Sequence, residues 1–561
     1  MQPVSAPRSV GHLWCQLAAG MGLGLVIAAQ AAAPTLDHLF PPSARPGSTN
    51  EITGVGTLTP WPTPLVFNHP GIHAEPTTNA PKYRVVVDPD VPPGTYLARA
   101  LNEEGASNPR FLIVDPRPVQ TEVEPNDASK QAQVVDSLPA LIEGRLEKRD
   151  DVDTFEVTVA KGRTLIARIE AFVLASPLDA VLRIRDDRGT LIGWNHDDGF
   201  TFDPFLAVTA PESGRYRIEV FGFPHPAESD VRFTGNARCV YRLHLADGPY
   251  ALGLDPAGLS RVQSTEARIL GFNLASESPR IHLPAQTTAA TNQPWIQPTL
   301  AGYAGPAWIP LGNGPELRET REGTNTPVLP VPSAVTGMLA TRGERDHYGF
   351  AATKGTIYRI EVHATALGSP LDASLRILDA AGKELAHDDD SSFGDPALTW
   401  KAPSDGTFRA VVGSVLSQTG TDHRYRLQLE VVTPGVRATA AASALSVETG
   451  KTNEFKVALQ RLGGLEGPLR IEVQDPPEGV SVVPVDVSGD AKEATLLWTA
   501  TTNAPPVQRP LRIHVRSGTN GPLFHVIHEL ATTGENNGVP QGFHRLLINE
   551  TDWLWLTVRK K

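Results

Sequence analysis

Four oxygen-bearing side chains gather within six residues in the stretch EVEPND. They are Glu122, Glu124, Asn126 and Asp127, and Pro125 lies between them. In an extended segment alternate side chains point the same way, so Glu122 and Glu124 share one face. Pro125 bends the chain and lets Asn126 and Asp127 turn toward the same point. Carboxylate and amide oxygens are the ligands that Ca²⁺ takes in proteins, about six to eight of them at about 2.3–2.6 Å.

A second acidic stretch supplies the ligands that the first one lacks. Four side chains do not complete a calcium shell, and the loop with Asp150, Asp151 and Asp153 is the nearest further source. Carboxylates that converged without a cation would repel one another and raise each other's pKa. A solvated acidic linker is the alternative interpretation. The pattern predicts one Ca²⁺ site with the ligands Glu122, Glu124, Asn126, Asp127, Asp150, Asp151 and Asp153.

Further aspartates occur in two corresponding sets. The first set is Asp179, Asp197, Asp198 and Asp203, and the second is Asp372, Asp389, Asp390 and Asp395. A separate cation site is one interpretation. The favoured one is turn chemistry, because Asp side chains tighten loops through hydrogen bonds to their own backbone.

The composition indicates a large, folded, acidic protein. The chain has 561 residues, of which 40% are hydrophobic, and a formal net charge of −12. That length predicts several domains. The acidic balance disfavours nucleic acid and anionic membrane surfaces as partners and suits cations. High proline and glycine counts, 50 and 49, indicate many turns between short strands.

The first 31 residues have the features of an export signal. Arg8 precedes the apolar, small-residue run Leu13–Ala29, and Ala29-Gln30-Ala31 forms an A-x-A cleavage site. We expect secretion, with the protein periplasmic, released or held at the cell surface, and no membrane span after signal removal. Cys15 lies in this signal and leaves Cys239 alone, so we expect no internal disulfide and no lipid anchor.

A unit of more than a hundred residues occurs twice. SPLDAVLRIRDDRG, starting at Ser176, returns as SPLDASLRILDAAG, starting at Ser369, and the similarity extends in both directions. Each copy follows a shorter segment, and the two shorter segments also resemble each other. These periods are too long for a solenoid. They predict separate modules along the chain.

Within the modules the apolar period is two. In TFEVTVAKGRTLIARIEAF, Phe155, Val157 and Val159 alternate with polar residues, and Leu165 and Ile169 continue the pattern after a Lys-Gly turn. No segment keeps the three- and four-residue spacing of a helix. The expected fold class is therefore all-β, with tandem antiparallel β-sandwiches throughout.

The large repeat resembles the bacterial pre-peptidase C-terminal domain. The similarity lies in E-x-E-P-N-D, G-x-L…D-D-x-D-x-F (Gly144 to Phe155), LDAVLRI, NHDD before Asp203-Pro204, and P-x-S-G-x-Y (Pro211 to Tyr216). The resemblance implies a non-catalytic jelly-roll sandwich that binds calcium in collagenase members and collagen in some. The short segments resemble Ig-like IPT/TIG modules. The predicted parts are a signal peptide (1–31), Ig-like modules (34–116 and 247–317), large sandwiches (117–246 and 318–432) and a C-terminal Ig-like sandwich (433–561).

The second large copy departs from the acidic pattern. Its leading segment, ELRETREGTN, keeps Glu319, Glu322 and Asn325 without the ordered motif. Asp346 remains, whereas Glu344 and Gly343 replace the counterparts of Asp151 and Asp150. We expect no calcium site there.

The sequence predicts no catalytic residues. It contains no G-x-S-x-G and no H-E-x-x-H, and His525 and His528 face opposite sides of a strand. The favoured function is an exported adhesion or scaffold protein that recognises extracellular protein or polysaccharide and is stabilised by calcium. One alternative is an accessory or targeting component for a secreted peptidase. Another is a hydrolase whose tail DWLWLTV lines a sugar site, although a packed strand is the favoured interpretation of that stretch.

Overall fold

The structure is a computed structural model. It describes residues 32–197, 202–225, 232–275, 279–287, 294–298, 300–305, 308–320, 326–391, 394–533 and 545–561. The expected export signal and Cys15 lie outside these residues. The chain divides into two units, Met1–Ala32 and Ala33–Lys561, and the description below concerns the second.

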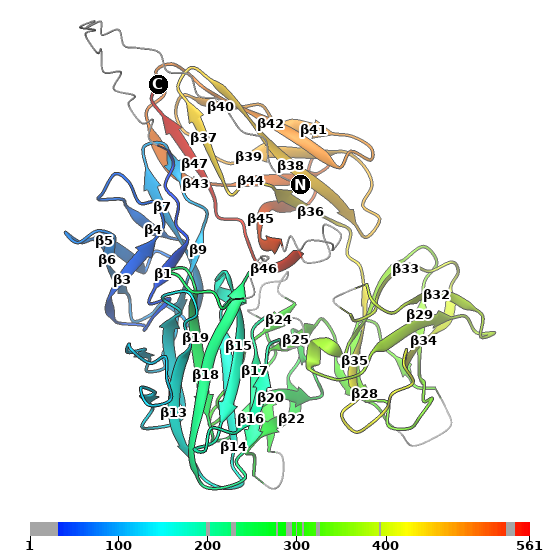
Figure 1. Cartoon of the computed structure of the whole chain (residues 1–561). Coiled ribbons are helices and arrows are strands. Elements are labelled where there is room, and N and C mark those ends of the chain that lie inside the picture. Colours follow the sequence, from blue (N-terminus) through cyan, green and yellow to red (C-terminus); the bar gives the residue numbers. More distant parts are fainter. Residues whose placement is uncertain are drawn as a thin grey trace, which may run out of the picture. The chain divides into compact units, whose positions relative to one another are not determined.

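The fold is all-β, as the alternating apolar pattern predicts (Figure 1). The helical elements of the described residues are two 3₁₀ turns, η1 (Phe172–Leu174) and η2 (Thr365–Leu367). All six alternating apolar positions of the first copy are buried, with at most 2% of their surface exposed: Phe155, Val157, Val159, Leu165, Ala167 and Ile169.

Two sheets form from the residues before the first large copy. One has the order β1-β3-β6-β5 and the other β2-β9-β7-β4, with β8 beside β7. Their strands are β1 (His38–Phe40), β2 (Ser43–Ala44), β3 (Thr49–Val55), β4 (Leu65–Phe67), β5 (Ile72–Pro76), β6 (Lys82–Val87), β7 (Gly94–Asn102), β8 (Gly105–Ala106) and β9 (Arg110–Val114).

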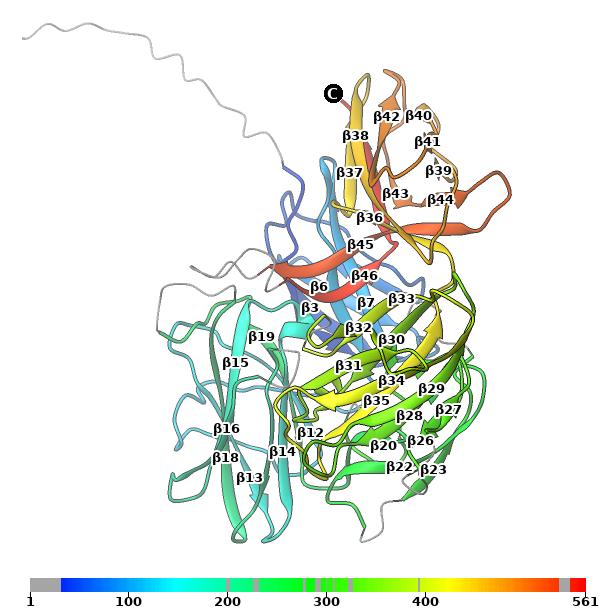
Figure 2. The ribbon, with the colours of Figure 1, turned by 90° about the vertical axis from the view of Figure 1, so that its right-hand side faces the viewer.

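The first large copy forms two five-stranded sheets, β10-β12-β19-β14-β17 and β11-β13-β18-β15-β16. Figure 2 labels β13, β15, β16 and β18 of one sheet and β12, β14 and β19 of the other. The strands are β10 (Gln120–Thr121), β11 (Gln133–Val134), β12 (Ala140–Arg145), β13 (Asp153–Val159), β14 (Thr164–Glu170), β15 (Leu178–Arg185), β16 (Leu191–Asn195), β17 (Phe205–Thr209), β18 (Gly214–Pro224) and β19 (Val240–Ala246).

The second large copy repeats this topology strand for strand, as β26-β28-β35-β30-β33 and β27-β29-β34-β31-β32. Its strands are β26 (Glu316–Arg318), β27 (Val328–Leu329), β28 (Ser333–Met338), β29 (Asp346–Ala352), β30 (Ile357–His363), β31 (Ala373–Leu378), β32 (Glu384–Asp388), β33 (Ala397–Lys401), β34 (Gly406–Ser414) and β35 (Arg424–Val431). The sequence repeat is thus also a repeat of sheet order.

The residues between the copies form two small sheets, β20-β22-β23 and β21-β25-β24. Their strands are β20 (Tyr250–Asp255), β21 (Leu259–Ser260), β22 (Thr265–Phe272), β23 (Arg280–Leu283), β24 (Trp295–Ile296) and β25 (Ile309–Gly312).

The tail forms a nine-stranded and a three-stranded sheet around one core that includes the buried Trp498. Its strands are β36 (Gly435–Ala440), β37 (Ala444–Glu448), β38 (Thr452–Leu462), β39 (Leu469–Val473), β40 (Val480–Val482), β41 (Val485–Val487), β42 (Glu493–Ala500), β43 (Val507–Leu511), β44 (Ile513–Ser517), β45 (Leu523–Thr533), β46 (Arg545–Thr551) and β47 (Leu554–Arg559).

The sheets are not antiparallel throughout, and this corrects the sequence-based expectation. In each large copy the two leading strands join their sheet in parallel: β10 beside β12 and β11 beside β13, then β26 beside β28 and β27 beside β29. A short strand that is not joined to its neighbour by a hairpin is free to add in either direction. The leading segment of the first copy, which carries EVEPND, therefore runs alongside β12.

Candidate metal centre

Glu122 follows directly on β10 and is fixed against the end of β12. Its backbone N–H donates to the carbonyl of Glu143 at 3.0 Å, and its Oε1 accepts from the N–H of Arg145 at 2.6 Å. The parallel pairing of β10 with β12 sets this register. The first carboxylate of EVEPND is thus part of the sheet edge.

Tyr241 of β19 joins Glu122 to Asp153. Its hydroxyl lies 2.9 Å from Glu122 Oε2 and 2.6 Å from Asp153 Oδ2. A hydroxyl has one proton, so it satisfies only one of the two carboxylates at a time. Gly144 makes room for this contact, because a Cβ there would lie 2.3 Å from the tyrosine oxygen. The glycine of the G-x-L motif thus allows the close approach of these side chains.

Glu124, Asp127 and Asp151 form a second carboxylate group. One oxygen from each lies within 4.8 Å of the others. Asp151 is fully buried, and its Oδ2 accepts from the backbone N–H of Glu147. Lys148, which is largely exposed, places its Nζ 2.8 Å from Asp127 and 3.6 Å from Asp151. The two acidic stretches of the sequence therefore meet in the structure.

Several oxygens in this region are buried without a hydrogen bond. Asn126 is fully buried, and neither its Oδ1 nor its Nδ2 has a partner among the described residues. The oxygens in the same state are Glu124 Oε1, Asn126 Oδ1, Asp151 Oδ1 and Asp153 Oδ1. Buried polar atoms almost always have a hydrogen bond, so four buried oxygens without one in the same region require an explanation. A hard cation is the partner that carboxylate and amide oxygens share.

Burial and the crowding of these carboxylates raise the pKa values of three of them. Burial, with the charge of Glu124 adding to it, raises the pKa of Glu122 to about 7. Burial and contact with Asp127 raise the pKa of Asp151 to about 6. Burial and then the charge of Glu122 raise the pKa of Asp153 well above its ordinary value. Without a cation the region therefore binds protons near neutral pH.

Asp150 lies apart from this group. It is exposed, has a positive φ of 63°, and pairs with Arg232. Contact with Arg232 lowers the pKa of Asp150. Of the seven ligands that the sequence predicts, Glu124, Asp127 and Asp151 lie in one group, and Tyr241 joins Glu122 to Asp153 in the other. The charge of Glu124 acts on Glu122 and that of Asp151 on Asp153, so the two groups are neighbours. Tyr241 is a further part of the region that the sequence analysis missed, because nothing in a regular strand pattern distinguishes it.

The second copy also gathers carboxylates. Oxygens of Glu319, Glu344 and Asp346 lie within 4.8 Å of one another. Each of these residues accepts a hydrogen bond, from the backbone N–H groups of Met338 and Ala340 and from the hydroxyl of Tyr425. Glu322 and Asn325 lie outside the described residues. These donors correspond to those of Glu122, Asp151 and Asp153 in the first copy, so the second copy retains this part of the arrangement.

The further aspartates divide between two roles. Asp203 is buried and accepts from the backbone N–H groups of residues 171–173, at the start of η1. Asp395 does the same for residues 364–366 at η2. Turn chemistry thus explains both.

Asp179 and Asp197 lie instead with a histidine. Ligand atoms of Asp179, His196 and Asp197 come within 4.8 Å of one another. Burial raises the pKa of Asp179 to about 6. The sequence analysis missed His196, and Asp198 lies outside the described residues.

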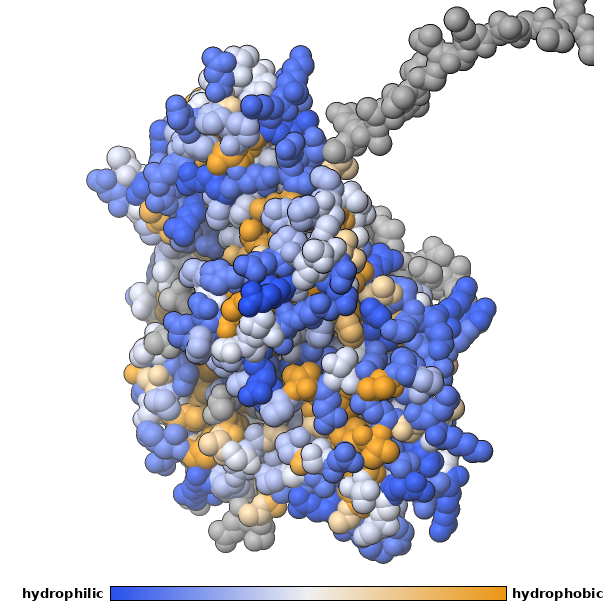
Figure 3. All heavy atoms as spheres, turned by 90° about the vertical axis from the view of Figure 1, so that its left-hand side faces the viewer, coloured by the Kyte–Doolittle hydropathy of each residue, from blue (hydrophilic) through white to orange (hydrophobic). Residues whose placement is uncertain are grey.

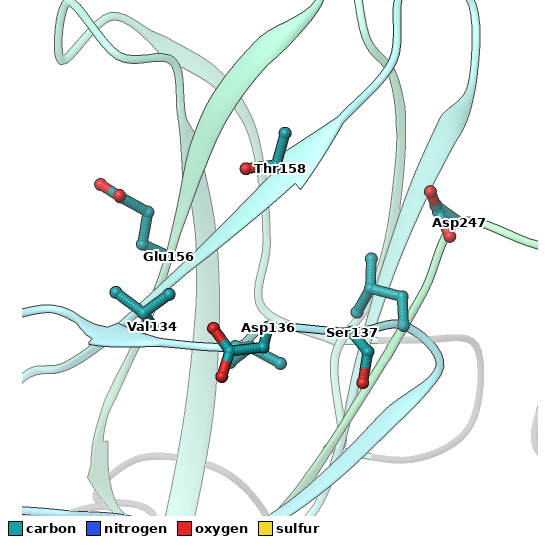
Figure 4. Close-up of a pocket in the computed structure, with 8 residues that line it drawn as sticks. Val134, Asp136, Ser137, Glu156, Thr158 and Asp247 are labelled. Carbon is teal, nitrogen blue, oxygen red and sulfur yellow. The ribbon is translucent and has the colours of Figure 1, made fainter.

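An acidic pocket of about 420 Å³ opens beside β11 and β13 (Figure 4). Asp136, Glu156 and Asp247 line it with Ser137 and Thr158. Over the face that Figure 3 shows, apolar residues form separate patches on a mainly hydrophilic surface. Hydroxyl and carboxylate groups thus line the same pocket.

The histidines, the cysteine and the tryptophans that were candidates for catalysis lie in strands or in packed positions. His525 and His528 lie in one strand, β45, at positions of opposite face. Cys239 is buried directly before β19, and burial raises the pKa of its thiol. Trp555 is only 5% exposed and Arg99 lies over Trp553 at 5.1 Å, so the DWLWLTV strand is packed, as favoured above. Among the described residues no helix has the length and apolar character of a membrane span.

Comparisons with known proteins give partial similarities. No protein-family model matches the chain. A probable subtilase-type serine protease of Deinococcus radiodurans is 41% identical over 70 residues, which are 12% of this chain and 10% of that protein. The chain therefore spans a tenth of that relative's length.

Solved structures are similar at low identity. The pre-peptidase C-terminal domain of a Bacillus anthracis collagenase is 12% identical, with a TM-score of 0.17, covering 20% of this chain and all of that one. The M60 catalytic domain with two CBM51 domains of Clostridium perfringens ZmpB is 9% identical, with a TM-score of 0.14, covering 71% of this chain and 46% of that one.

Proposed function

We propose that the chain is an exported, non-catalytic protein of tandem β-sandwiches that binds extracellular polymers, and that Ca²⁺ stabilises its first large sandwich. The single observation that carries the calcium proposal is the set of four buried oxygens without a hydrogen bond on Glu124, Asn126, Asp151 and Asp153, of which Asp151 Oδ1 has Lys148 Nζ at 3.6 Å. Their burial without a cation is costly, since an unsatisfied buried group costs about 1–3 kcal/mol, and more when it is charged.

The donor set suits calcium better than a transition metal. All the candidate ligand atoms are oxygens, and no histidine or cysteine takes part. Hard oxygen donors select Ca²⁺ or Mg²⁺, and Ca²⁺ tolerates the irregular geometry of loop carboxylates. Glu124, Asn126, Asp127 and Asp151 would hold the ion, and Asp153 would supply a further oxygen. Lys148 is exposed and free to leave Asp127 when the ion binds.

Hydrogen–deuterium exchange of the full chain tests the site, with and without a calcium chelator. We expect Ca²⁺ to slow exchange in peptides of residues 120–157, and to leave residues 326–360 of the second copy unchanged. Asp151→Asn should abolish the effect, because it removes a ligand charge at nearly constant volume. Lys148→Gln should tighten binding severalfold, because it removes a competing positive charge.

Equal protection of the two copies, or protection of neither, would refute the assignment. Glu454→Gln, an exposed residue of β38, serves as a charge-matched control for Asp151→Asn and should keep the full response.

One observation favours a second candidate, an accessory role beside a secreted peptidase. The 70-residue similarity to a probable subtilase-type protease indicates that such a segment also occurs in a peptidase. Affinity capture of the tagged full chain from culture medium decides between the two. Recovery of a peptidase at stoichiometric amounts supports the accessory role, and its absence leaves polymer binding as the function.

A further inference from the structure

One face of the first large sandwich is chemically unlike its counterpart in the second. It is the outer face of the sheet β11-β13-β18-β15-β16. The inward residues Leu182, Ile184, Ile218 and Val220 are fully buried, so their strand neighbours point outward. On part of this face Phe233 packs on Phe221 with ring centroids 4.5 Å apart. The remainder of the face is formed by charged side chains.

Those charged side chains carry a local positive surplus. Arg183 Nε and Arg185 Nε lie 2.8 and 3.0 Å from the two oxygens of Glu219. In the same way Arg215 and Arg217 share Glu156, at 3.2 and 3.1 Å. Four guanidinium groups thus meet two carboxylates, which leaves two positive charges on this stretch of the face, in a chain whose net charge is −12.

An exposed tryptophan borders the arginines. Trp194 lies in the edge strand β16 directly opposite Arg183, and 62% of its surface is exposed. Leu191, opposite Arg185, is 43% exposed. The strand is anchored by Asn195 from its other side, since its Nδ2 donates to the carbonyl of Phe205 at 2.6 Å. An indole with 62% of its surface exposed contributes little to the packing of the sandwich.

We propose that this face binds an anionic polysaccharide whose sugar rings carry carboxylates. The inference deepens the proposed polymer binding and rests on it. The indole of Trp194 offers a flat apolar surface with a negative ring face, which suits the C–H side of a sugar ring. Arg183 and Arg185 present planar forks of N–H donors, which match carboxylates in geometry and charge. From β13 to β16 the face spans about 14 Å at about 4.8 Å per strand, enough for a short run of sugars.

The second copy retains Arg376 and Arg409 at the positions of Arg183 and Arg217 but lacks the rest of this chemistry. The structural repeat pairs Trp194 with His387, Arg185 with Leu378 and Glu219 with Val411. It also pairs Glu156 with Gly349 and Arg215 with Thr407. The inward positions remain apolar in both copies, as Leu182 and Leu375 are both fully buried. Two sandwiches with one core pattern therefore differ where a ligand would bind.

Acidic groups bound the positive stretch at both ends. Beyond β13 lies the pocket with Asp136 and Asp247 (Figure 4), and beyond Phe221 lie Asp179 and Asp197. An anionic polymer is repelled at these ends, so we place its carboxylates on the arginines of β15 and β18. The pocket is not part of the proposed site.

Affinity electrophoresis and calorimetry of the full chain test the proposal. The probes are polygalacturonate and alginate as anionic polysaccharides, dextran as a neutral one, and single-stranded DNA as a polyanion without sugar carboxylates. We expect binding to at least one of the two polyuronates, weakened at least tenfold in 0.5 M NaCl, and none to dextran or DNA. Preferential binding of dextran, or equal binding of DNA, would overturn the proposal.

The second copy supplies matched variants. Trp194→His and Arg185→Leu introduce the residues found at the corresponding positions, and each should weaken polyuronate binding at least tenfold. His387→Ala in the second copy should leave it unchanged. Unchanged calcium-dependent exchange protection shows that the variants are folded.

The outcomes separate this inference from the function on which it rests. Polyuronate binding that survives Trp194→His and Arg185→Leu refutes this face and keeps polymer binding elsewhere on the chain. If no probe binds, both the proposed face and polymer binding are refuted for these polymers. The protection by Ca²⁺ is measured in a separate experiment and does not depend on this result.

Discussion

The carboxylates of the acidic region in the first copy lie so close together that they favour binding either protons or a cation. Tyr241 can donate to only one of Glu122 and Asp153 at a time, so the other faces an oxygen lone pair. A proton on one carboxylate relieves this contact at low pH, and Ca²⁺ would relieve the crowding at neutral pH. The raised pKa values follow from this competition.

The competition predicts how stability depends on pH. Because the pKa of Glu122 is raised from 4.5 to about 7 and that of Asp151 from 3.8 to about 6, the folded state binds more protons than the unfolded state between those values. The stability of the calcium-free first sandwich should therefore fall as pH rises from about 4 to about 7. Bound Ca²⁺ removes the protons, so its stabilising effect should be larger at pH 7.5 than at pH 5.

Urea-dependent hydrogen exchange of residues 120–157 measures this effect at both pH values. Glu122→Gln should flatten the calcium-free dependence, because it removes the group with the pKa of about 7. A calcium effect that is larger at pH 5 than at pH 7.5 contradicts the linkage.

Sequence reasoning located the acidic region but not its internal arrangement. Alternation and a proline suffice to bring Glu122 to Asp127 near one point, and the structure brings Asp151 and Asp153 to them. Asp150 differs from Asp151 in being exposed, in its positive φ of 63° and in its partner, Arg232, which is 82 residues away. Local spacing carries no information on such a long-range pair.

At the scale of strands, the apolar period of two predicted which residues are buried. It could not predict which strands pair with one another across long stretches of sequence. Phe155 and Ile169 are buried as the alternation requires. The parallel addition of β10 and β11 was missed, because both directions of pairing satisfy the same alternation. The charged network across β12, β14 and β19 was missed for a related reason, since its members lie far apart in sequence.

That network gives a prediction for β19. Arg242 is 2% exposed and contacts Asp115 at 2.6 Å, Glu170 at 2.7 Å and Glu143 at 3.4 Å. Burial alone would raise the pKa of Glu170, but the charges of His244 and Arg242 outweigh it and hold the pKa well below the ordinary value. Arg242→Met would leave buried carboxylates uncompensated and should destabilise the sandwich by about 3–5 kcal/mol.

A compensated variant distinguishes lost charge balance from lost packing. Adding Glu143→Gln and Glu170→Gln to Arg242→Met should recover much of the loss, because the remaining carboxylate, Asp115, is still paired with Arg117 at 2.6 Å. Urea unfolding monitored by exchange of β14 and β19 peptides measures both. Equal destabilisation of the single and triple variants would assign the effect of Arg242 to packing.

At the scale of the whole molecule, the two large copies share topology and core and differ in their exposed chemistry. The buried Tyr241 and Tyr425 occupy corresponding places beside Gly144 and Gly337, where an added Cβ would come within 2.3 Å of either hydroxyl. Both copies keep this close contact between a glycine and a tyrosine, and the contact belongs to the shared fold. Exchanging Trp194 for His387 on an outer face leaves the fold intact, so the copies are free to acquire different ligands.

The proposed function also requires that the chain leave the cytoplasm, and this gives the last prediction. Signal peptidase recognises small residues at the first and third positions of A-x-A, so cleavage after Ala31 should give a mature chain that starts at Ala32. Intact-mass measurement of the exported protein reads this terminus directly.

Ala31→Phe should block processing and leave the chain longer by the full leader, whereas Gln30→Leu, at the unread middle position, should be processed normally. Since the unit that holds the sandwiches begins at Ala33, cleavage there removes none of its strands. An exported chain that retains residues 1–31, or unprocessed protein confined to the cytoplasm, would contradict the export prediction and with it the extracellular role.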